Sequence, residues 1–246
     1  METLRARLAT LPDDQAVRGF VLREALSVMQ TDDVVDLLDR ALESAASGDG
    51  PSQILLTAFS NMMIDLDRLE APLYDRLAAA YSTAIEAGNE RVCRLFRQTP
   101  PARTQPAGDS DLAGASIQDV STGMRTTLSR TRERRTIEKL IRDPSQRVVE
   151  ALLENPRLTE SDALAIAARR PATTDILRTV FNSRRWKTNR RVRLAIALNP
   201  YSPPVLAMAV LHSLSLTELM EVALSEEVHA SVSTAASEMA RARKAG

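Results

Sequence analysis

An apolar pattern that recurs in the second half of the chain constrains its fold more than any other feature. Five positions recur 44 residues later with an identical or similar residue: Val148, Ala151, Leu152, Asn155 and Pro156 recur as Val192, Ala195, Ile196, Asn199 and Pro200. Each copy has helical spacing and ends at an Asn-Pro pair, where proline stops the helix and asparagine is expected to bond local backbone groups. The pattern predicts short helices stacked as repeats, an architecture that usually presents a binding surface.

The composition of the 246 residues favours an all-α protein. Aromatic residues make up only 3% of the chain, alanine and leucine are abundant, and no sustained strand-like alternation occurs. Prolines at positions 144, 156, 171 and 200 each follow a helix-like segment. Helices this short are not stable alone, so we expect them to stack on their neighbours.

Charge and composition divide the chain into three parts. Residues 1–118 carry 11 basic and 18 acidic side chains, whereas residues 119–246 carry 21 and 14. Between the helical segments of the two halves, residues 98–118 are rich in proline, alanine and serine and contain few apolar side chains. We therefore predict an acidic N-terminal helical domain over 1–97, a flexible linker or long surface loop over 98–118 and a basic helical-repeat domain over 119–246.

The first long helix of the acidic half is predicted from one cap and one apolar face. Asp13 or Asp14 is expected to cap it, and its inward face is expected to be formed by Val17, Phe20, Val21, Ala25 and Val28. A later helix, near residues 72–87, is expected to end at Gly88-Asn89. These segments predict an N-terminal bundle of amphipathic helices.

The basic half resembles a known fold family. The residues that carry the resemblance are Gly123-Met124-Arg125, Leu140-Ile141-Arg142-Asp143-Pro144, the run from Val148 to Glu160, Ala167-Ala168-Arg169-Arg170-Pro171, Arg185-Trp186, Val192-Arg193-Leu194-Ala195 and Asn199-Pro200-Tyr201-Ser202-Pro203. This string resembles a family of uncharacterised bacterial α-helical repeat proteins, and it is similar to leucine-rich-variant and HEAT-like repeats. The resemblance covers about half of the chain and implies short helices alternating along a curved rod. It implies no reaction.

Residues for catalysis, metals or cofactors are sparse. Cys93 is the only cysteine, so we expect a small core residue in a reducing compartment and no iron–sulfur centre of the kind found in some leucine-rich-variant proteins. His212 and His229, the only histidines, lie apart in sequence, and no phosphate-binding glycine loop occurs. We therefore expect no cofactor, no metal and no enzymatic activity. No apolar run is long enough to cross a bilayer, and a cytoplasmic protein is expected.

The strongest candidate for function is a basic segment near the end of the repeat region. Residues 184–193 carry six positive side chains, no acid and the only tryptophan. The candidate contact residues are Arg184, Arg185, Trp186, Lys187, Arg190, Arg191 and Arg193. Arginines and an aromatic ring can anchor a protein partner, or can neutralise phosphates and stack a base. Equally, Trp186 can pack between repeats and the arginines can cap helix ends.

These observations lead to one function hypothesis and one alternative. The first is a non-enzymatic adaptor or scaffold that binds another protein along the repeat surface. The alternative is a nucleic-acid-binding repeat protein that uses Arg184–Arg193. Neither the identity of the partner nor the oligomeric state is specified by these residues.

Overall fold

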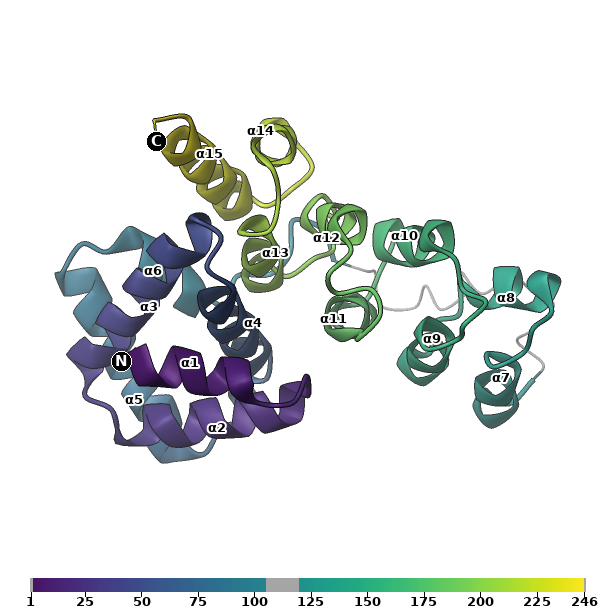
Figure 1. Cartoon of the computed structure of the whole chain (residues 1–246), viewed down its shortest axis with the longest axis horizontal. Coiled ribbons are helices and arrows are strands. Elements are labelled where there is room, and N and C mark those ends of the chain that lie inside the picture. The colour runs from purple at the N-terminus through teal and green to yellow at the C-terminus, as the bar shows by residue number, and fades with distance from the viewer. Residues whose placement is uncertain (1, 105–119, 246) are drawn as a thin grey trace. The chain divides into compact units, whose positions relative to one another are not determined.

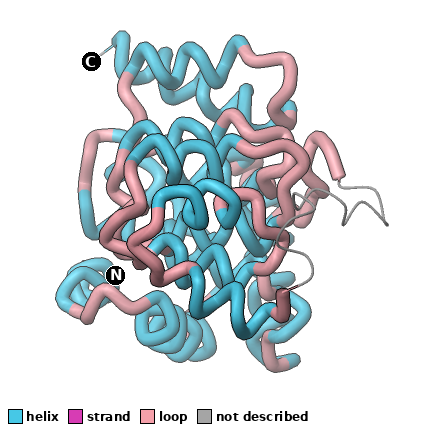
Figure 2. The backbone as a smooth tube through the Cα atoms, turned by 90° about the vertical axis from the view of Figure 1, so that its right-hand side faces the viewer, coloured by secondary structure: helices cyan, strands magenta, loops and turns pink. Residues whose placement is uncertain are grey.

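The computed structural model describes residues 2–104 and 120–245, and over these ranges the protein is all-helical, without a strand (Figures 1 and 2). The prediction of an all-α protein is confirmed. Residues 105–119 are not described, and they include positions 105–118 of the predicted linker. Contacts group the chain into two compact units. Unit 1 comprises Met1–Thr99, Pro203–Leu224 and Ala230–Gly246, and unit 2 comprises Pro100–Ser202 and Ser225–His229.

Unit 1 contains the longer helices of the protein. Its elements are α1 (Glu2–Thr10), α2 (Gln15–Val28), α3 (Thr31–Ala46), α4 (Gly50–Ile64), the 3-10 helix η1 (Leu66–Arg68), α5 (Ala71–Glu86), α6 (Glu90–Phe96), α13 (Pro204–Leu211), α14 (Leu216–Leu224) and α15 (Ala230–Ala245). Helix α13 packs on α4 and α15, and α14 packs on α15. The last three helices, which the sequence predicts to belong with the basic repeats of 119–246, therefore group by contact with the N-terminal helices.

The ends of the unit 1 helices follow local sequence signals. The Asp14 side chain accepts hydrogen bonds from the backbone N–H groups of Ala16, at 2.8 Å, and Val17, at 3.3 Å, which confirms the predicted cap of α2. Gly88 has a φ of +65° just beyond α5, and Gly48 has a φ of +95° just beyond α3. Both helices thus end in the left-handed conformation that favours glycine.

The core of unit 1 corrects one prediction from sequence. Helix α2 buries Leu22 and Leu26 completely, whereas Phe20 is 58% exposed and Val28 is 78% exposed. The predicted inward face of α2 was therefore wrong for Val17, Phe20 and Val28, whereas Val21 and Ala25 are partly buried against the core. The apolar residues of α2 occupy more than one face, so their spacing fits two helical phases. Packing against α4 and α5 selects the phase that contains the leucines.

Unit 2 consists of shorter helices in two rows. The helices are α7 (Thr122–Leu128), α8 (Arg134–Leu140), α9 (Gln146–Leu153), α10 (Glu160–Ala168), α11 (Thr174–Asn182) and α12 (Arg190–Ala197). In Figure 1, α7, α9 and α11 form one row and α8, α10 and α12 form the other. Helix α9 contacts both α7 and α11, and α10 contacts α12. Each helix begins 24 to 30 residues before the next helix of its row.

The 44-residue recurrence does not correspond to this pairing. It relates α9 to α12, which are three helices apart and lie in different rows. The recurring residues mark equivalent helices, each with a buried apolar face and an Asn-Pro corner, rather than equivalent helix pairs. An Asn-Pro corner thus serves a helix in either row.

Candidate partner-binding surface

The asparagine of each corner joins the ends of two neighbouring helices in a row. Asn155, just beyond α9, donates from Nδ2 to the carbonyl oxygens of Ser129 at 2.7 Å and Thr131 at 2.8 Å, just beyond α7. Its Oδ1 accepts from the N–H of Arg157 at 2.8 Å, which confirms the predicted local bond. One buried amide therefore closes its own turn and binds the end of the preceding helix.

The second corner repeats this arrangement in the other row. Asn199, just beyond α12, donates to the carbonyl oxygens of Ala167 at 2.8 Å and Arg169 at 3.1 Å, at the end of α10. Its Oδ1 accepts from the N–H of Tyr201 at 3.0 Å. Arg169 in turn donates to the carbonyl oxygen of Asp143, beyond α8, at 2.8 Å. Side-chain bonds thus connect the ends of α8, α10 and α12 in sequence.

Two of the predicted contact residues belong to the same kind of connection. Arg185, in the loop after α11, donates to the carbonyl oxygens of Asn155 at 2.5 Å and Leu158 at 2.9 Å. Trp186 is only 6% exposed, and its Nε1 donates to the carbonyl oxygen of Leu153 at 3.1 Å. The Arg185 guanidinium lies 4.6 Å from the centre of the Trp186 ring. These side chains hold the end of α9, which is the structural role that the sequence also allowed.

The other predicted contact residues divide by exposure. Arg193 donates to the carbonyl oxygen of Lys187, and burial lowers the pKa of its guanidinium. Arg191 is paired with Glu160 at 3.2 Å, yet its side chain is 73% exposed. Arg184 and Arg190 are also exposed. Arg185 is exposed as well, despite its bonds to backbone carbonyls, so the charge that the segment presents to solvent comes mainly from Arg184, Arg185, Arg190 and Arg191.

Two carboxylates of unit 2 are buried and support the fold. Asp143 accepts from Arg125 Nε at 2.8 Å, and Asp162 accepts both Nη groups of Arg134 at 2.5 Å. Asp162 also forms a capping box with Thr159 at the start of α10. The guanidinium of Arg134 is the main cause that lowers the pKa of Asp162 to about 2. Residues 125–193 contain 18 basic and 8 acidic side chains, and these two buried carboxylates are each paired with an arginine.

A groove of about 570 Å³ lies between α7 and α9, at the first Asn-Pro corner. It is lined by Thr126, Arg130, Arg147, Glu150, Ala151, Glu154, Asn155 and Pro156. Its two arginines and two glutamates are exposed, so the groove presents both signs of charge. Sequence reasoning missed this groove. The signal was the polar face of α9, where Arg147, Glu150 and Glu154 have helical spacing.

Helix α2 carries an exposed apolar stripe, which the sequence pattern did not distinguish from a buried face. Phe20 and Val28 are exposed on α2, as is Tyr74 on the neighbouring α5 at 46% exposure. The apolar periodicity that marks this stripe was interpreted as a core face. Periodicity locates an apolar face but does not tell whether the rest of the protein covers it.

Within residues 2–104 and 120–245, no group of three or more histidine, cysteine or acidic side chains is arranged to hold a metal ion. In the same ranges, no helix has the length and apolar content that a membrane span requires. The chain matches no protein-family model, no curated protein and no solved structure.

Proposed function

We propose that the protein is a non-enzymatic scaffold that binds another protein along the surface of unit 2. In this proposal, unit 2 is a HEAT-like or leucine-rich-variant-like array of short helices, and the N-terminal helices form a bundle. The alternating rows of α7 to α12 support the array, because α9 contacts α7 and α11 in one row and α10 contacts α12 in the other.

The groove between α7 and α9 is the observation that carries the proposal. A site for phosphates is expected to present positive charge alone, whereas this groove combines Arg130 and Arg147 with Glu150 and Glu154. Mixed charges of this kind suit a protein surface of complementary pattern, because they reject partners that place like charges together. The connected helix ends support a preformed groove, which lowers the entropic cost of binding.

Site-specific crosslinking in the full chain tests this proposal. A photo-crosslinking residue is placed at Glu150 in the groove and, as the matched control, at Glu138, an exposed glutamate of α8. We expect Glu150 to give one protein adduct in nuclease-treated lysate, and Glu138 to give none. Replacing Arg130 and Arg147 by Glu should abolish the adduct. Equal labelling at both positions, or no groove adduct, would contradict the proposal.

Nucleic-acid binding is the second candidate, supported by the excess of exposed arginine in unit 2. Trp186 is buried and bonded, so this mechanism uses phosphate contacts through Arg184, Arg190 and Arg191 without base stacking by the indole. Changing these three arginines to Gln should reduce the slope of log affinity against log salt by about 3, from about 0.9 per phosphate contact. Arg185 is left unchanged because it caps α9. An unaltered slope would exclude this segment as the phosphate site.

A further inference from the structure

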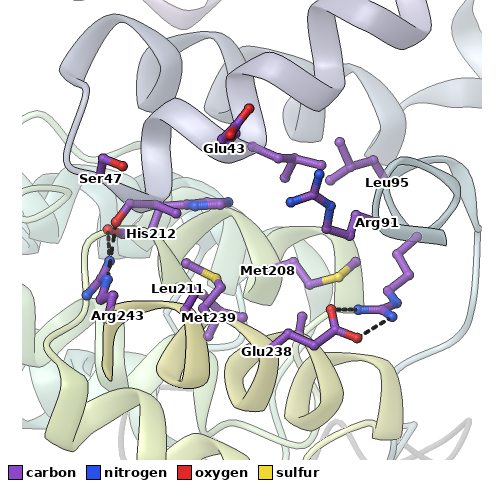
Figure 3. A pocket seen from close by; sticks show the side chains of 15 residues that line it. Glu43, Ser47, Arg91, Leu95, Met208, Leu211, His212, Glu238, Met239 and Arg243 are labelled. Atoms are coloured by element: carbon purple, nitrogen blue, oxygen red, sulfur yellow. Dashed lines mark hydrogen bonds and ion pairs between the residues drawn. The ribbon is translucent and has the colours of Figure 1, made fainter. Parts of the chain in front are cut away.

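A second cavity lies entirely within unit 1, between α3, α6, α13 and α15 (Figure 3). Its volume is about 450 Å³, which is within the range of small-molecule sites. Most of its wall is apolar and includes Leu42, Leu95, Met208, Leu211 and Met239. Methionine side chains are flexible and polarizable, so this wall can adapt to an apolar ligand.

One polar side chain in this wall has an unfilled hydrogen-bonding position. His212 follows the last residue of α13 and is only 7% exposed. Its Nδ1 is buried and has no hydrogen-bond partner among the described residues. Figure 3 shows the imidazole ring directed into the cavity. A buried polar atom without a partner is costly, so this position favours a ligand that can bond it.

The ring of His212 is neutral at physiological pH. Burial lowers the pKa of His212 to about 4, and the positive charge of Arg243 acts in the same direction. A neutral imidazole has one nitrogen that donates and one that accepts a hydrogen bond. A hydroxyl group can pair with either nitrogen because it both donates and accepts.

Of the three arginines that line the cavity, two are paired with carboxylates and the third is bonded to backbone carbonyls. Arg94 forms two bonds with Glu238, at 2.7 and 2.9 Å, and Arg91 pairs with Asp39 at 2.9 Å. Arg243 donates to backbone carbonyls, including that of His212 at 3.0 Å. The remaining carboxylate of the wall, Glu43, is exposed to solvent. The bonds of Arg243 engage its Nε and both Nη atoms, and the rest of the wall is mainly apolar, so the cavity favours an uncharged ligand over a buried carboxylate.

We propose that this cavity binds an uncharged, mainly apolar small molecule whose hydroxyl group hydrogen-bonds the ring of His212. The apolar body of the ligand lies against the leucine and methionine side chains, and the hydroxyl satisfies Nδ1 or its tautomeric partner. This site is separate from the groove of unit 2. It stands whether or not the scaffold proposal holds.

Imidazole NMR of the full chain tests the proposal directly, because the protein has only two histidines. The probes are 1-octanol, methyl octyl ether, which lacks the hydroxyl donor, and octanoate, which is charged. We expect 1-octanol to shift the ring nitrogens of His212 saturably by several ppm and to leave those of His229 unchanged. Octanoate should bind at least about tenfold more weakly, a difference of about 1.4 kcal/mol.

Two variants separate ligand binding from a merely structural effect. His212→Phe keeps the apolar shape but removes the hydrogen bond, so the preference for 1-octanol over the ether should disappear. Ala235→Phe fills the cavity and should abolish binding of all three probes while leaving His212 in place. His229→Gln assigns the spectrum and should leave binding unchanged. The proposal is overturned if His212 does not respond to 1-octanol, or if octanoate binds as tightly.

Discussion

The helices of the two units are stabilised in different ways. In the described part of the chain, unit 1 has five helices of 14 to 16 residues, α2 to α5 and α15, and the first four contribute side chains to a shared apolar core. Unit 2 has six helices of 7 to 9 residues, α7 to α12, whose ends are joined by side-chain bonds to backbone carbonyls. Every helix leaves four N–H and four C=O groups without an intrahelical partner. These groups are a larger share of a short helix than of a long one, so the short helices of unit 2 need more partners from side chains.

The comparison shows that polar side chains take a structural role at the ends of short helices. In a helix of 8 residues such as α9, nearly every backbone polar group lies within four residues of an end. Asn155, Arg185 and Trp186 all donate to carbonyls at such ends, so residue types usually associated with binding have a structural role here. An arginine-rich segment among short helices is therefore partly a structural feature.

Each unit contains a natural reporter that allows the comparison to be tested. Cys93, a buried free thiol, lies in α6 of unit 1, and burial raises its pKa, so labelling of the thiol reports opening of that unit. Trp186, the only tryptophan, lies in unit 2, so its fluorescence reports unfolding there.

Removing an aromatic side chain from the core of unit 1 should have the largest effect. Phe59 is fully buried and meets Phe96 edge to face, with ring centres 5.4 Å apart. We expect Phe59→Ala to lower the free energy of unfolding by about 3–5 kcal/mol, because it leaves a cavity. The shift should appear in Cys93 labelling against denaturant, with a smaller change in the Trp186 transition. A larger shift in Trp186 would show that the units do not unfold separately.

Acid should destabilise unit 1 at a higher pH than unit 2. The pKa of His212 is lowered from 6.5 to about 4 in the folded protein, so between these values the unfolded chain binds a proton that the folded chain does not. Stability should therefore fall by about 3 kcal/mol as the pH drops from 6.5 to 4. Arg91, Arg94, Arg243, Glu43 and Glu238 also face this site. His212→Phe should flatten this part of the Cys93 profile.

The corresponding group in unit 2 acts in a lower pH window. Asp162 has its pKa lowered from 3.8 to about 2, so its contribution is present above pH 3.8 and is lost as the pH falls toward 2. We expect the Trp186 transition to weaken in that window, and Asp162→Asn to remove the pH dependence there. A Trp186 transition that weakens already between pH 6.5 and 4 would contradict this assignment.

Removing a corner asparagine should destabilise unit 2 by an intermediate amount. Asn155→Ala removes two donors from carbonyl groups beyond α7, and we expect a loss of about 2 kcal/mol in the Trp186 transition. The matched control is Asn189→Ala, which removes one bond, to the N–H of Val192, and should cost about 1 kcal/mol. Equal costs would show that the Asn155 bond between helices adds nothing.

The smallest effect is expected on the exposed stripe of α2. Phe20 is 58% exposed, so Phe20→Ser should change the free energy of unfolding by less than about 0.5 kcal/mol. Leu22→Ala, two positions away and fully buried, should cost about 2–5 kcal/mol in the same Cys93 measurement. Similar costs would mean that Phe20 is part of the core, as its spacing first suggested.

The sequence by itself determined the features that depend on neighbouring residues. The all-helical class, the cap at Asp14, the glycine end of α5 and the Asn-Pro corners follow from local backbone chemistry and were predicted. So were the segments that form short helices, because the residue before a proline is biased away from the helical conformation. The basic excess of unit 2 is also a property of sequence alone.

Only the tertiary structure decided which side of each element is covered and what each polar group bonds. On α2 it is Leu22, and not Phe20, that is buried. Helices α13 to α15 group by contact with the N-terminal helices, and the side chains of Arg185 and Trp186 bond the end of α9. The tertiary structure also placed His212 on the wall of a cavity formed by helices from both ends of the chain. Apolar spacing identifies a helix face, and clustered basic residues identify a charged segment. Which side chains are buried, and which groups they bond, depends on residues distant in sequence. That is the physical reason why these contacts required the fold.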